Sequence, residues 1–281
     1  MNQVPILVIG KNGKTGSRVD RRLQDLGYTT RAVSRSTTPA FDWERPETWR
    51  PAIEGARSAY VTYQPDLAMP HAEDDIGTFV EIAREAGLEH IVLLSGRGEP
   101  GAQRAEEIVR SSGIPWNIVR ASWFFQNFSE SFMLQGIVSG ELVLPAGEVV
   151  EPFVDADDIA EVAVAALTRS SLHNRVFEVT GPRAMTFAQC MQEISDALGR
   201  PVKYTRVPVD AYIGALQEQG LPVAMQWLLR ELFTVVLDGR NSRTVNGVEQ
   251  ALGRPATDFK RYIEKPIGSG VWQGEGMRET A

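Results

Sequence analysis

The sequence predicts an α/β fold, in which a doubly wound parallel sheet forms the N-terminal part and a smaller C-terminal α/β region follows it. Over the first 120 residues, short apolar and β-branched runs alternate with longer segments of helical periodicity, which is the pattern of βαβ units. The apolar runs are nearly continuous, as in strands that are covered on both faces. Gly27, Gly87 and Gly113 each follow a helical segment, where a left-handed residue commonly ends a helix.

The N-terminal part is expected to contain five strands and four helices. The expected strands are Pro5–Ile9, Thr29–Val33, Ala59–Thr62, His90–Leu94 and Trp116–Val119. The expected helices lie at residues 14–26, 46–54, 73–87 and 101–112. Short strands that are separated in this way by helical segments predict parallel pairing through crossover connections.

After Arg120 the pattern becomes less regular. An aromatic segment, Trp123–Phe132, precedes a stretch rich in glycine and proline at 136–152, which has two short strand candidates. Further on, the pattern predicts a helix capped by Asp155 and ending at Leu167, a helix at Phe187–Leu198 with Thr186 near its cap, strands at 176–179 and 202–207, and mostly helical structure to Tyr262. We therefore expect a first domain at residues 1–152, a smaller and mainly helical region at 153–267, and a frayed tail at 268–281.

The composition is that of an ordinary soluble globular protein. Of the 281 residues, 43% are apolar and 23% are charged, which excludes disordered and fibrous chains. The longest apolar run, Val4–Ile9, is far shorter than the roughly 18–20 residues that span a bilayer, so no membrane association and a cytoplasmic location are expected. The formal net charge of −7, with no dense basic stripe, makes nucleic acid an unfavourable partner.

The sequence has no metal-ligand spacing. It contains one cysteine, Cys190, and three scattered histidines, so neither an internal disulfide nor a structural zinc site is expected. The three carboxylates Asp155, Asp157 and Asp158 are interpreted as the start of a helix, where negative charge is favourable, rather than as a metal site.

The strongest chemical signal is a glycine-rich turn where the first strand must pass into the first helix. Three glycines at a spacing of three fit a tight turn, a close approach of the backbone to a pyrophosphate, and close helix–strand packing. The candidate dinucleotide-binding residues of this turn are Gly10, Lys11, Asn12, Gly13, Lys14, Thr15 and Gly16. A sharp turn without a ligand is the alternative. A triphosphate P-loop is excluded, because it needs a glycine at the position of Val8.

The end of the second strand indicates which dinucleotide is bound. An NAD site usually has an Asp or Glu about 20 residues after the glycines, whereas an Arg there accommodates the 2′-phosphate of NADP. Here the chain reads Arg31-Ala32-Val33-Ser34-Arg35-Ser36, without a carboxylate. Arg35 and its flanking hydroxyls, including Ser36, therefore favour NADP(H). The alternative is that Arg35 is a solvated loop charge.

Several motifs together resemble the NmrA-like family of atypical short-chain dehydrogenase/reductases. They are Gly10-x-x-Gly13-x-x-Gly16, the Arg after strand 2, Phe41-Asp42-Trp43, Val92-Leu93-Leu94-Ser95, Ser112–Arg120, Phe124-x-x-Asn127-Phe128, Phe153–Ala160, Thr180-Gly181-Pro182 and Leu252–Pro255. The segment from Phe41 to Glu44 and the run from Tyr63 to Asp66 look most similar to the branch of festuclavine and agroclavine dehydrogenases. The resemblance implies a Rossmann domain that binds NADP(H), with Asp42 near the adenine.

The sequence departs from the family pattern at the catalytic acid. Short-chain dehydrogenases use a Tyr-x-x-x-Lys pair, in which the Lys lowers the pKa of the Tyr that donates the proton. The corresponding stretch, Gly96–Glu107, contains neither Tyr nor Lys. An ordinary carbonyl reductase is therefore not expected. An acceptor that is already electron-poor, such as an iminium or a quinone, fits better.

Two hydroxyls and three other side chains are the candidates for contact with substrate. Ser95 and Tyr63 follow central strands and are candidates for the catalytic role, although each also fits a structural role, as a capping serine or a packing tyrosine. Phe125, Phe128 and Phe132 share one helical face and are expected in the core. The wall of the substrate pocket is expected to be formed by Trp123, Phe124 and Asn127, which fall off that face. Glu106 resembles a helix glutamate of the family that is more often structural than catalytic.

Two classes of function remain open at this point. The first is an NADPH-dependent reductase that transfers hydride to a flat, electron-poor small molecule. The second is a non-catalytic sensor of the NADP redox state that acts through a regulatory protein partner; a homodimer is also compatible with the sequence. The missing Tyr/Lys pair favours the sensor, whereas the aromatic segment and the resemblance to a dehydrogenase branch favour the enzyme.

Overall fold

The computed structural model describes residues 4–273. The chain divides into two compact units that alternate along the sequence. The first unit comprises Met1–Ala121, Ala156–Val179 and Asn246–Pro255, and the second comprises Ser122–Asp155, Thr180–Val245 and Ala256–Ala281. Among the described residues, no helix is long and apolar enough to cross a membrane.

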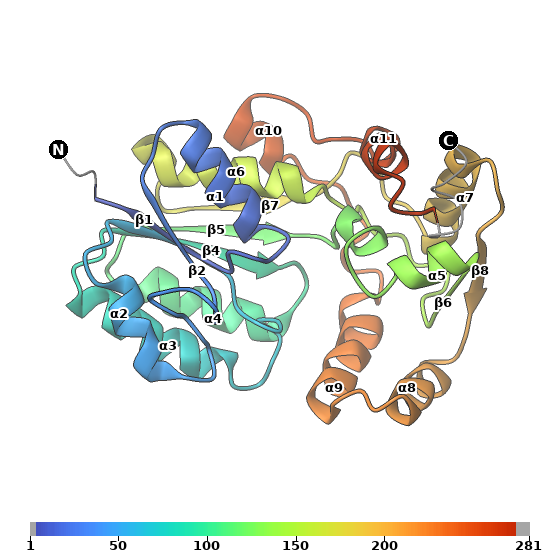
Figure 1. Ribbon diagram of the computed structural model, residues 1–281, viewed down its shortest axis with the longest axis horizontal. Coiled ribbons are helices and arrows are strands. Elements are labelled where there is room, and N and C mark those ends of the chain that lie inside the picture. Colours follow the sequence, from blue (N-terminus) through green and yellow to red (C-terminus); the bar gives the residue numbers. More distant parts are fainter. Residues whose placement is uncertain (1–3, 274–281) are drawn as a thin grey trace. The chain divides into compact units, whose positions relative to one another are not determined.

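A six-stranded parallel sheet forms the centre of the first unit (Figure 1). Its strands are β1 (Ile6–Ile9), β2 (Thr30–Val33), β3 (Ser58–Val61), β4 (His90–Gly96), β5 (Trp116–Ala121) and β7 (Arg175–Val179). They run in the order β2-β1-β3-β4-β5-β7, so the order reverses beside β1. In doubly wound sheets, ligands bind at the carboxyl ends of the strands near this reversal. The expected doubly wound α/β fold is thus confirmed.

Helices cover both faces of this sheet (Figure 1). One layer consists of α1 (Gly16–Asp25), α6 (Ala156–Thr168) and α10 (Gly247–Leu252), and the other of α2 (Trp49–Ile53), α3 (Ala72–Glu85) and α4 (Pro100–Ser111). In α3 the buried residues Ile76, Phe79, Val80 and Ala83 recur at helical spacing, so a single apolar stripe faces the core. A 3₁₀ turn, Pro46–Thr48, leads into α2, and another, Ser170–Leu172, follows α6.

The second unit is mainly helical. Its helices are α5 (Leu134–Ser139), α7 (Phe187–Leu198), α8 (Val209–Glu218), α9 (Val223–Glu231) and α11 (Phe259–Ser269), and a π-helical turn, Leu232–Val236, continues α9. Two strands, β6 (Glu141–Leu144) and β8 (Lys203–Arg206), pair in parallel. The predicted cap of α7 is confirmed: Thr186 Oγ1 accepts from the N–H of Gln189 at 3.1 Å, and Gln189 Oε1 accepts from the N–H of Thr186 at 2.8 Å.

An aromatic cluster fills the core of the second unit. The rings of Phe128, Phe153 and Phe187 are fully buried, and their centroids lie 5.0–6.1 Å apart. Phe125 and Phe128 belong to this core, as predicted, but the prediction for Phe132 is wrong, since 48% of its surface is exposed. The reason is that residues 125–128 form a 3₁₀ helix and α5 begins only at Leu134, so no continuous α-helical face links Phe132 to the other two.

The strands and helices expected from the sequence agree with the structure to within about two residues in the first unit, except that 46–54 is divided into a 3₁₀ turn and α2. The domain limits differ. The strand expected at 176–179 in the C-terminal region is β7, which pairs with β5 and completes the main sheet of the first unit. Helix α6 also packs against α1 in the first unit. The chain thus returns to the first unit after residue 155.

The expected frayed tail is wrong for residues 268–273. Helix α11 ends at Ser269 with Gly270 in the left-handed conformation, and Trp272 is fully buried. The indole N–H of Trp272 donates to the carbonyl of Phe128 at 2.7 Å, which attaches this segment to the aromatic cluster. Burial of the apolar indole therefore stabilises this segment, although the residues around it are glycine-rich and polar. The remaining residues of the predicted tail, 274–281, lie outside the described residues.

Candidate functional site

The glycine-rich turn joins β1 to α1 and leaves no space for side chains at two of its glycines. Gly10 has a φ of +83°, and the N–H of Gly13 donates to the carbonyl of Gly10 at 2.8 Å. A Cβ on Gly16 would lie 2.2 Å from that same carbonyl oxygen, and a Cβ on Gly10 would lie 2.6 Å from Thr62 Oγ1. A side chain at Gly16 would displace the backbone, and a side chain at Gly10 would displace Thr62 and strain a backbone conformation with positive φ.

This turn fits a dinucleotide pyrophosphate. A Cβ on Gly13 would meet only the Gly10 oxygen at 3.2 Å, so the absence of side chains leaves bare backbone at the start of α1. Thr15, the residue before α1, makes no side-chain cap to the helix. A helix N-terminus of this kind favours an anion, because its N–H groups and the helix dipole both attract negative charge.

The loop after β2 is attached to this turn. The N–H groups of Gly10 and Lys11 both donate to the carbonyl of Val33 at 3.1 Å, and the amide of Asn12 reaches Ser34 Oγ at 3.5 Å. Ser34 Oγ lies 3.1 Å from Ser36 Oγ. The loop thus presents hydroxyls beside the exposed side chain of Arg35, and residues 34–37 contain no carboxylate.

Asp42 lies in the segment that follows this loop. Its carboxylate accepts from the N–H of Glu44 at 3.2 Å and stabilises its own turn, while its carbonyl accepts from the indole of Trp49 at 2.6 Å. The indole of its neighbour Trp43 donates to the carbonyl of Thr62 at 2.9 Å, which attaches the segment to the end of β3. Asp42 is half-buried at this corner, and its contact with an adenine stays a prediction.

Tyr63 follows β3 and is almost completely buried. Its hydroxyl donates to Asp75 Oδ2 on α3 at 2.5 Å, and its ring lies 4.8 Å from that of Trp43. Burial, followed by the hydrogen bond and the charge of Asp75, raises the pKa of Tyr63 well above its usual value. The pKa of Tyr63 is therefore shifted in the opposite direction from that of the tyrosine that short-chain dehydrogenases use as a proton donor.

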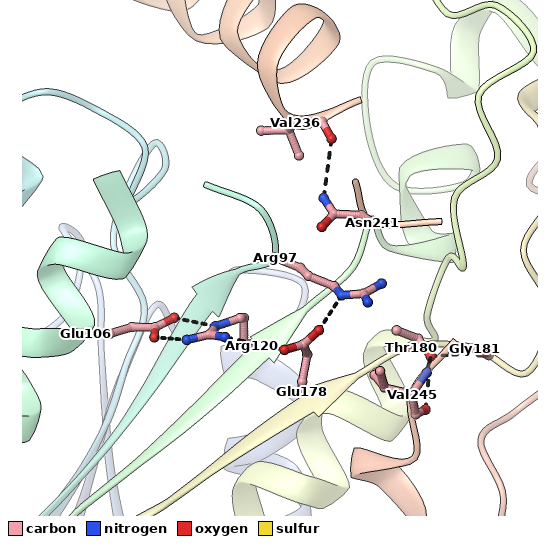
Figure 2. Close-up of polar contacts among 9 residues, drawn as sticks. All are labelled: Arg97, Glu106, Arg120, Glu178, Thr180, Gly181, Val236, Asn241 and Val245. Carbon is pink, nitrogen blue, oxygen red and sulfur yellow. Dashed lines mark hydrogen bonds and ion pairs between the residues drawn. The ribbon is translucent and has the colours of Figure 1, made fainter. Parts of the chain in front are cut away.

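Ser95, near the end of β4, is the first member of a chain of polar side chains. Its hydroxyl donates to Glu106 Oε1 on α4 at 2.5 Å. Glu106 also accepts from Nε of Arg120 at 2.9 Å and from a second nitrogen of the same guanidinium. Arg120 in turn contacts Glu178 at 3.4 Å, and Glu178 accepts from Nε of Arg97 at 2.6 Å (Figure 2). Burial of this chain is compensated because the opposite charges alternate.

The loops after β3 and β4 also bring two carboxyl groups together. Asp66 hydrogen-bonds with Glu99, and Asp66 Oδ1 accepts from the N–H of Ala68 at 2.8 Å. Burial raises the pKa of Asp66, and the hydrogen bonds with Ala68 and Glu99 oppose that shift. A Cβ on Gly96 would lie about 2.0 Å from the carboxyl of Glu99, so a side chain there would displace that carboxyl.

The three residues expected to form the substrate wall belong to the second unit. Trp123 packs against Phe187 and Phe233 with ring centroids 5.7 Å and 5.3 Å apart. Phe124 forms an isolated bridge to Val154, and its carbonyl accepts from the N–H of Asn127 at 3.1 Å. All three side chains are half-buried, whereas their neighbours Phe125 and Phe128 are buried. Their contact with substrate stays a prediction.

Sequence reasoning missed the polar chain, although part of its signal was visible. Arg120 is the one charged residue of strand β5, and a partly buried charge requires a partner. Glu106 was interpreted as structural, and the structure places it between Ser95 and Arg120. The interpretation of Asp157 and Asp158 as helix-start residues is confirmed; they pair with Arg22 and Arg254, each at 2.8 Å.

Comparison with known proteins identifies the family. The model of the NmrA-like family matches residues 103–266, which is more than half of the chain. The chain belongs to the NmrA-like family. An NAD(P)H azoreductase of Xenophilus azovorans is 30% identical over 92% of this chain and 96% of its own length. An agroclavine dehydrogenase of Claviceps fusiformis is 24% identical over 95% of this chain and 98% of its own length.

Two solved structures of similar fold are relevant to the choice between an enzyme and a regulator. The triphenylmethane reductase of Citrobacter sp., in complex with NADP(H), has a TM-score of 0.78 and 19% identity, and covers 93% of this chain and 99% of its own. NmrA, a negative transcriptional regulator in complex with NADP, has a TM-score of 0.70 and 17% identity, and covers 96% of this chain and 97% of its own. At these identities the two structures confirm the Rossmann-like fold, and they include both an enzyme and a regulator.

Proposed function

We propose that this member of the NmrA-like family is an NADPH-dependent reductase of a flat, electron-poor small molecule, such as an iminium or a quinone. The observation that carries the proposal is the glycine turn, whose bare backbone at Gly13 lies beside a hydroxyl-bearing loop with Arg35 and no carboxylate. This corner of the first unit fits a pyrophosphate and a 2′-phosphate together.

The turn and the loop after β2 bind different parts of the cofactor. Gly10, Gly13 and Gly16 let the backbone approach the pyrophosphate, and Thr15 precedes the helix that receives it. The exposed Arg35 and Ser36 bind the 2′-phosphate by charge and by hydroxyl donation. When bound, NADPH supplies a hydride, so that two electrons and one hydrogen reach the electron-poor carbon and NADP⁺ is left.

The missing acid restricts the acceptor. Tyr63 has a raised pKa and already donates to Asp75, and Ser95 already donates to Glu106. Neither hydroxyl has a proton ready for an alkoxide. The chain therefore acts by positioning acceptors that need no protonation in the hydride-transfer step itself. The names of the azoreductase and agroclavine dehydrogenase relatives support a reductase of such compounds.

The experiment is a titration followed by an activity panel. Binding of NADPH and NADH is measured by fluorescence, and NADPH oxidation is then followed with a quinone, an azo dye, a cyclic iminium and a simple ketone. We expect NADPH to bind, at least one of the first three acceptors to be reduced, and the ketone to remain unreduced. Reduction of the ketone, with one ionisation in its pH profile, would reveal an acid that this proposal lacks.

The second candidate is a sensor of the NADP redox state that binds a regulatory protein and catalyses nothing. Two observations favour it: the hydroxyls of Tyr63 and Ser95 both already donate to carboxylates, and the NmrA regulator has a similar fold. Tight NADPH binding without oxidation of any acceptor would select it.

A further inference from the structure

Two hydroxyl groups lie in the first unit at the carboxyl ends of β3 and β4, and each one donates its proton to a carboxylate of the chain. Tyr63 donates to Asp75 and Ser95 donates to Glu106, both at 2.5 Å. Since β3 and β4 are neighbours in parallel register, both groups follow the same edge of the sheet.

A hydroxyl has one proton and two lone pairs. Once the proton of Ser95 or Tyr63 is held by a carboxylate, the hydroxyl can offer a ligand only acceptor lone pairs. Such an oxygen attracts an N–H group or a positive charge and repels the carbonyl oxygen of a neutral acceptor. The direction of the two hydroxyl bonds would therefore set the polarity for a ligand that contacts these oxygens.

The neighbouring charges act in the same direction. The cations at this edge are already paired: Arg120 with Glu106 and Glu178, Arg97 with Glu178, and Arg104 with Glu73. His71 is exposed and lies with its ring 6.2 Å from that of Tyr63. Further carboxyl groups come from Glu44, Asp66, Asp75 and Glu99. The exposed cations Lys11 and Arg35 instead lie in the loops after β1 and β2, where phosphates are expected.

We propose that the subsite at the ends of β3 and β4 takes a cationic or N–H-bearing acceptor in preference to a neutral carbonyl compound, and that Glu106 and Asp75 are the positioning residues that set this preference. This inference rests on the proposed reductase function and names its substrate class. Glu106 acts through Ser95, and Asp75 acts through Tyr63. An iminium of this kind becomes a neutral amine by accepting a hydride alone, whereas a quinone needs an additional proton from water.

The test uses a pair of flat ligands that differ in charge. Binding of N-methylacridinium and of neutral acridine is measured by calorimetry at pH 8, with the NADP⁺-loaded full chain. We expect the wild type to bind the cation about tenfold more tightly, which corresponds to about 1.4 kcal/mol. Because this readout is equilibrium binding, it does not depend on turnover.

The variants change the direction of the hydroxyls with little change in shape. In Glu106→Gln and Asp75→Asn the new amide can donate to the hydroxyl, which is then free to direct its proton at the ligand. We expect the preference to fall to about threefold in each variant and to about onefold in the double variant. The matched controls Glu107→Gln and Asp74→Asn lie beside the test residues on the same helices, are exposed, and should keep the tenfold preference.

Two further measurements keep the outcomes distinct. If Glu106→Gln fails to fold, Ser95→Ala removes the acceptor oxygen instead and should lower the preference by a similar amount. A wild type without preference, or an unchanged preference in Asp75→Asn together with Glu106→Gln or Ser95→Ala, would overturn the inference. Failure of the reductase proposal is seen separately, as absence of NADPH oxidation with N-methylacridinium and with menadione while the binding preference persists.

Discussion

The two ends of the carboxyl edge in the first unit are constructed differently. The end at β1 and β2 consists of backbone: the glycine turn lies within seven residues, Gly10–Gly16, and the N–H groups of Gly10 and Lys11 donate to the carbonyl of Val33 at the end of β2. The end at β3 to β5 consists of side-chain pairs such as Tyr63–Asp75, 12 residues apart, and Arg97–Glu178, 81 residues apart. The first end is a local property of the chain, whereas the second exists only when the sheet is assembled.

The largest expected effect concerns the end made of side chains. Replacing Glu106 by Ala leaves the half-buried Arg120 without its main partner and Ser95 without its acceptor. Loss of one member of a buried pair leaves an uncompensated charge, so we expect the free energy of unfolding to fall by about 3 kcal/mol. Urea denaturation followed by circular dichroism measures it.

The adjacent residue provides the control for this prediction. Glu107 is exposed and pairs with Arg110 at 3.0 Å on the helix surface, where such pairs contribute only about 0.5 kcal/mol. Glu107→Ala should therefore leave the denaturation midpoint nearly unchanged. If Glu106→Ala were equally mild, the polar chain would not stabilise this end of the sheet.

This contrast explains which parts the sequence could predict. The strands and the glycine turn were predictable because strand patterns and glycine spacing are local. The partners of Ser95 and Tyr63 were not, because Glu106 and Asp75 lie on helices whose register against the sheet depends on the packing of the whole unit. The return of β7 to the main sheet was missed for the same reason, since its own sequence does not indicate that β5 is its neighbour.

The next prediction concerns the glycine turn, at the end made of backbone. Gly13→Val places a branched side chain where the pyrophosphate is expected, with only the Gly10 oxygen close to its Cβ. We expect the affinity for NADPH to fall at least about 100-fold, or about 2.8 kcal/mol, while the fold is kept. Fluorescence titration measures the affinity and circular dichroism the fold. Gly77→Ala, on α3 where a Cβ meets nothing within 4 Å, is the control and should bind normally. Unchanged binding in a folded Gly13→Val variant would mean that the turn is not a phosphate cradle.

The amino end of the same sheet allows a third test, which concerns pH. His90 begins β4; burial, and next the charge of His173, lower its pKa to about 4, while a hydrogen bond from Nε2 to Asn117 at 2.9 Å opposes the shift. In the unfolded chain the pKa of this histidine is near 6.5. Its contribution to stability is therefore fully present above pH 6.5 and is lost as the pH falls towards 4.

Between pH 7 and pH 5 this one group should remove about 2 kcal/mol of stability, because the unfolded chain binds a proton that the native chain does not. In His90→Gln the loss between the two pH values should be smaller by that amount, as measured by urea denaturation at each pH. His71→Gln, at an exposed position, should lose as much as the wild type. An equal loss in His90→Gln would show that other groups dominate the acid sensitivity.

The smallest expected effect tests Arg35, the charged side chain that we propose to bind the 2′-phosphate at the end of β2. Arg35 is exposed in a loop with Ser34 and Ser36 and without a carboxylate, so its removal should affect the 2′-phosphate and nothing else. We expect wild-type protein to bind NADPH about tenfold more tightly than NADH, or about 1.4 kcal/mol, and Arg35→Ala to lose most of that preference with little change in NADH affinity. Arg31→Ala is a matched control, since Arg31 donates instead to the carbonyls of Ala52 and Glu54. If Arg35→Ala kept the full preference for NADPH over NADH, that preference would come from the hydroxyls of the loop or from the backbone of the turn. The end at β1 and β2 would then depend even less on charged side chains than the end at β3 to β5.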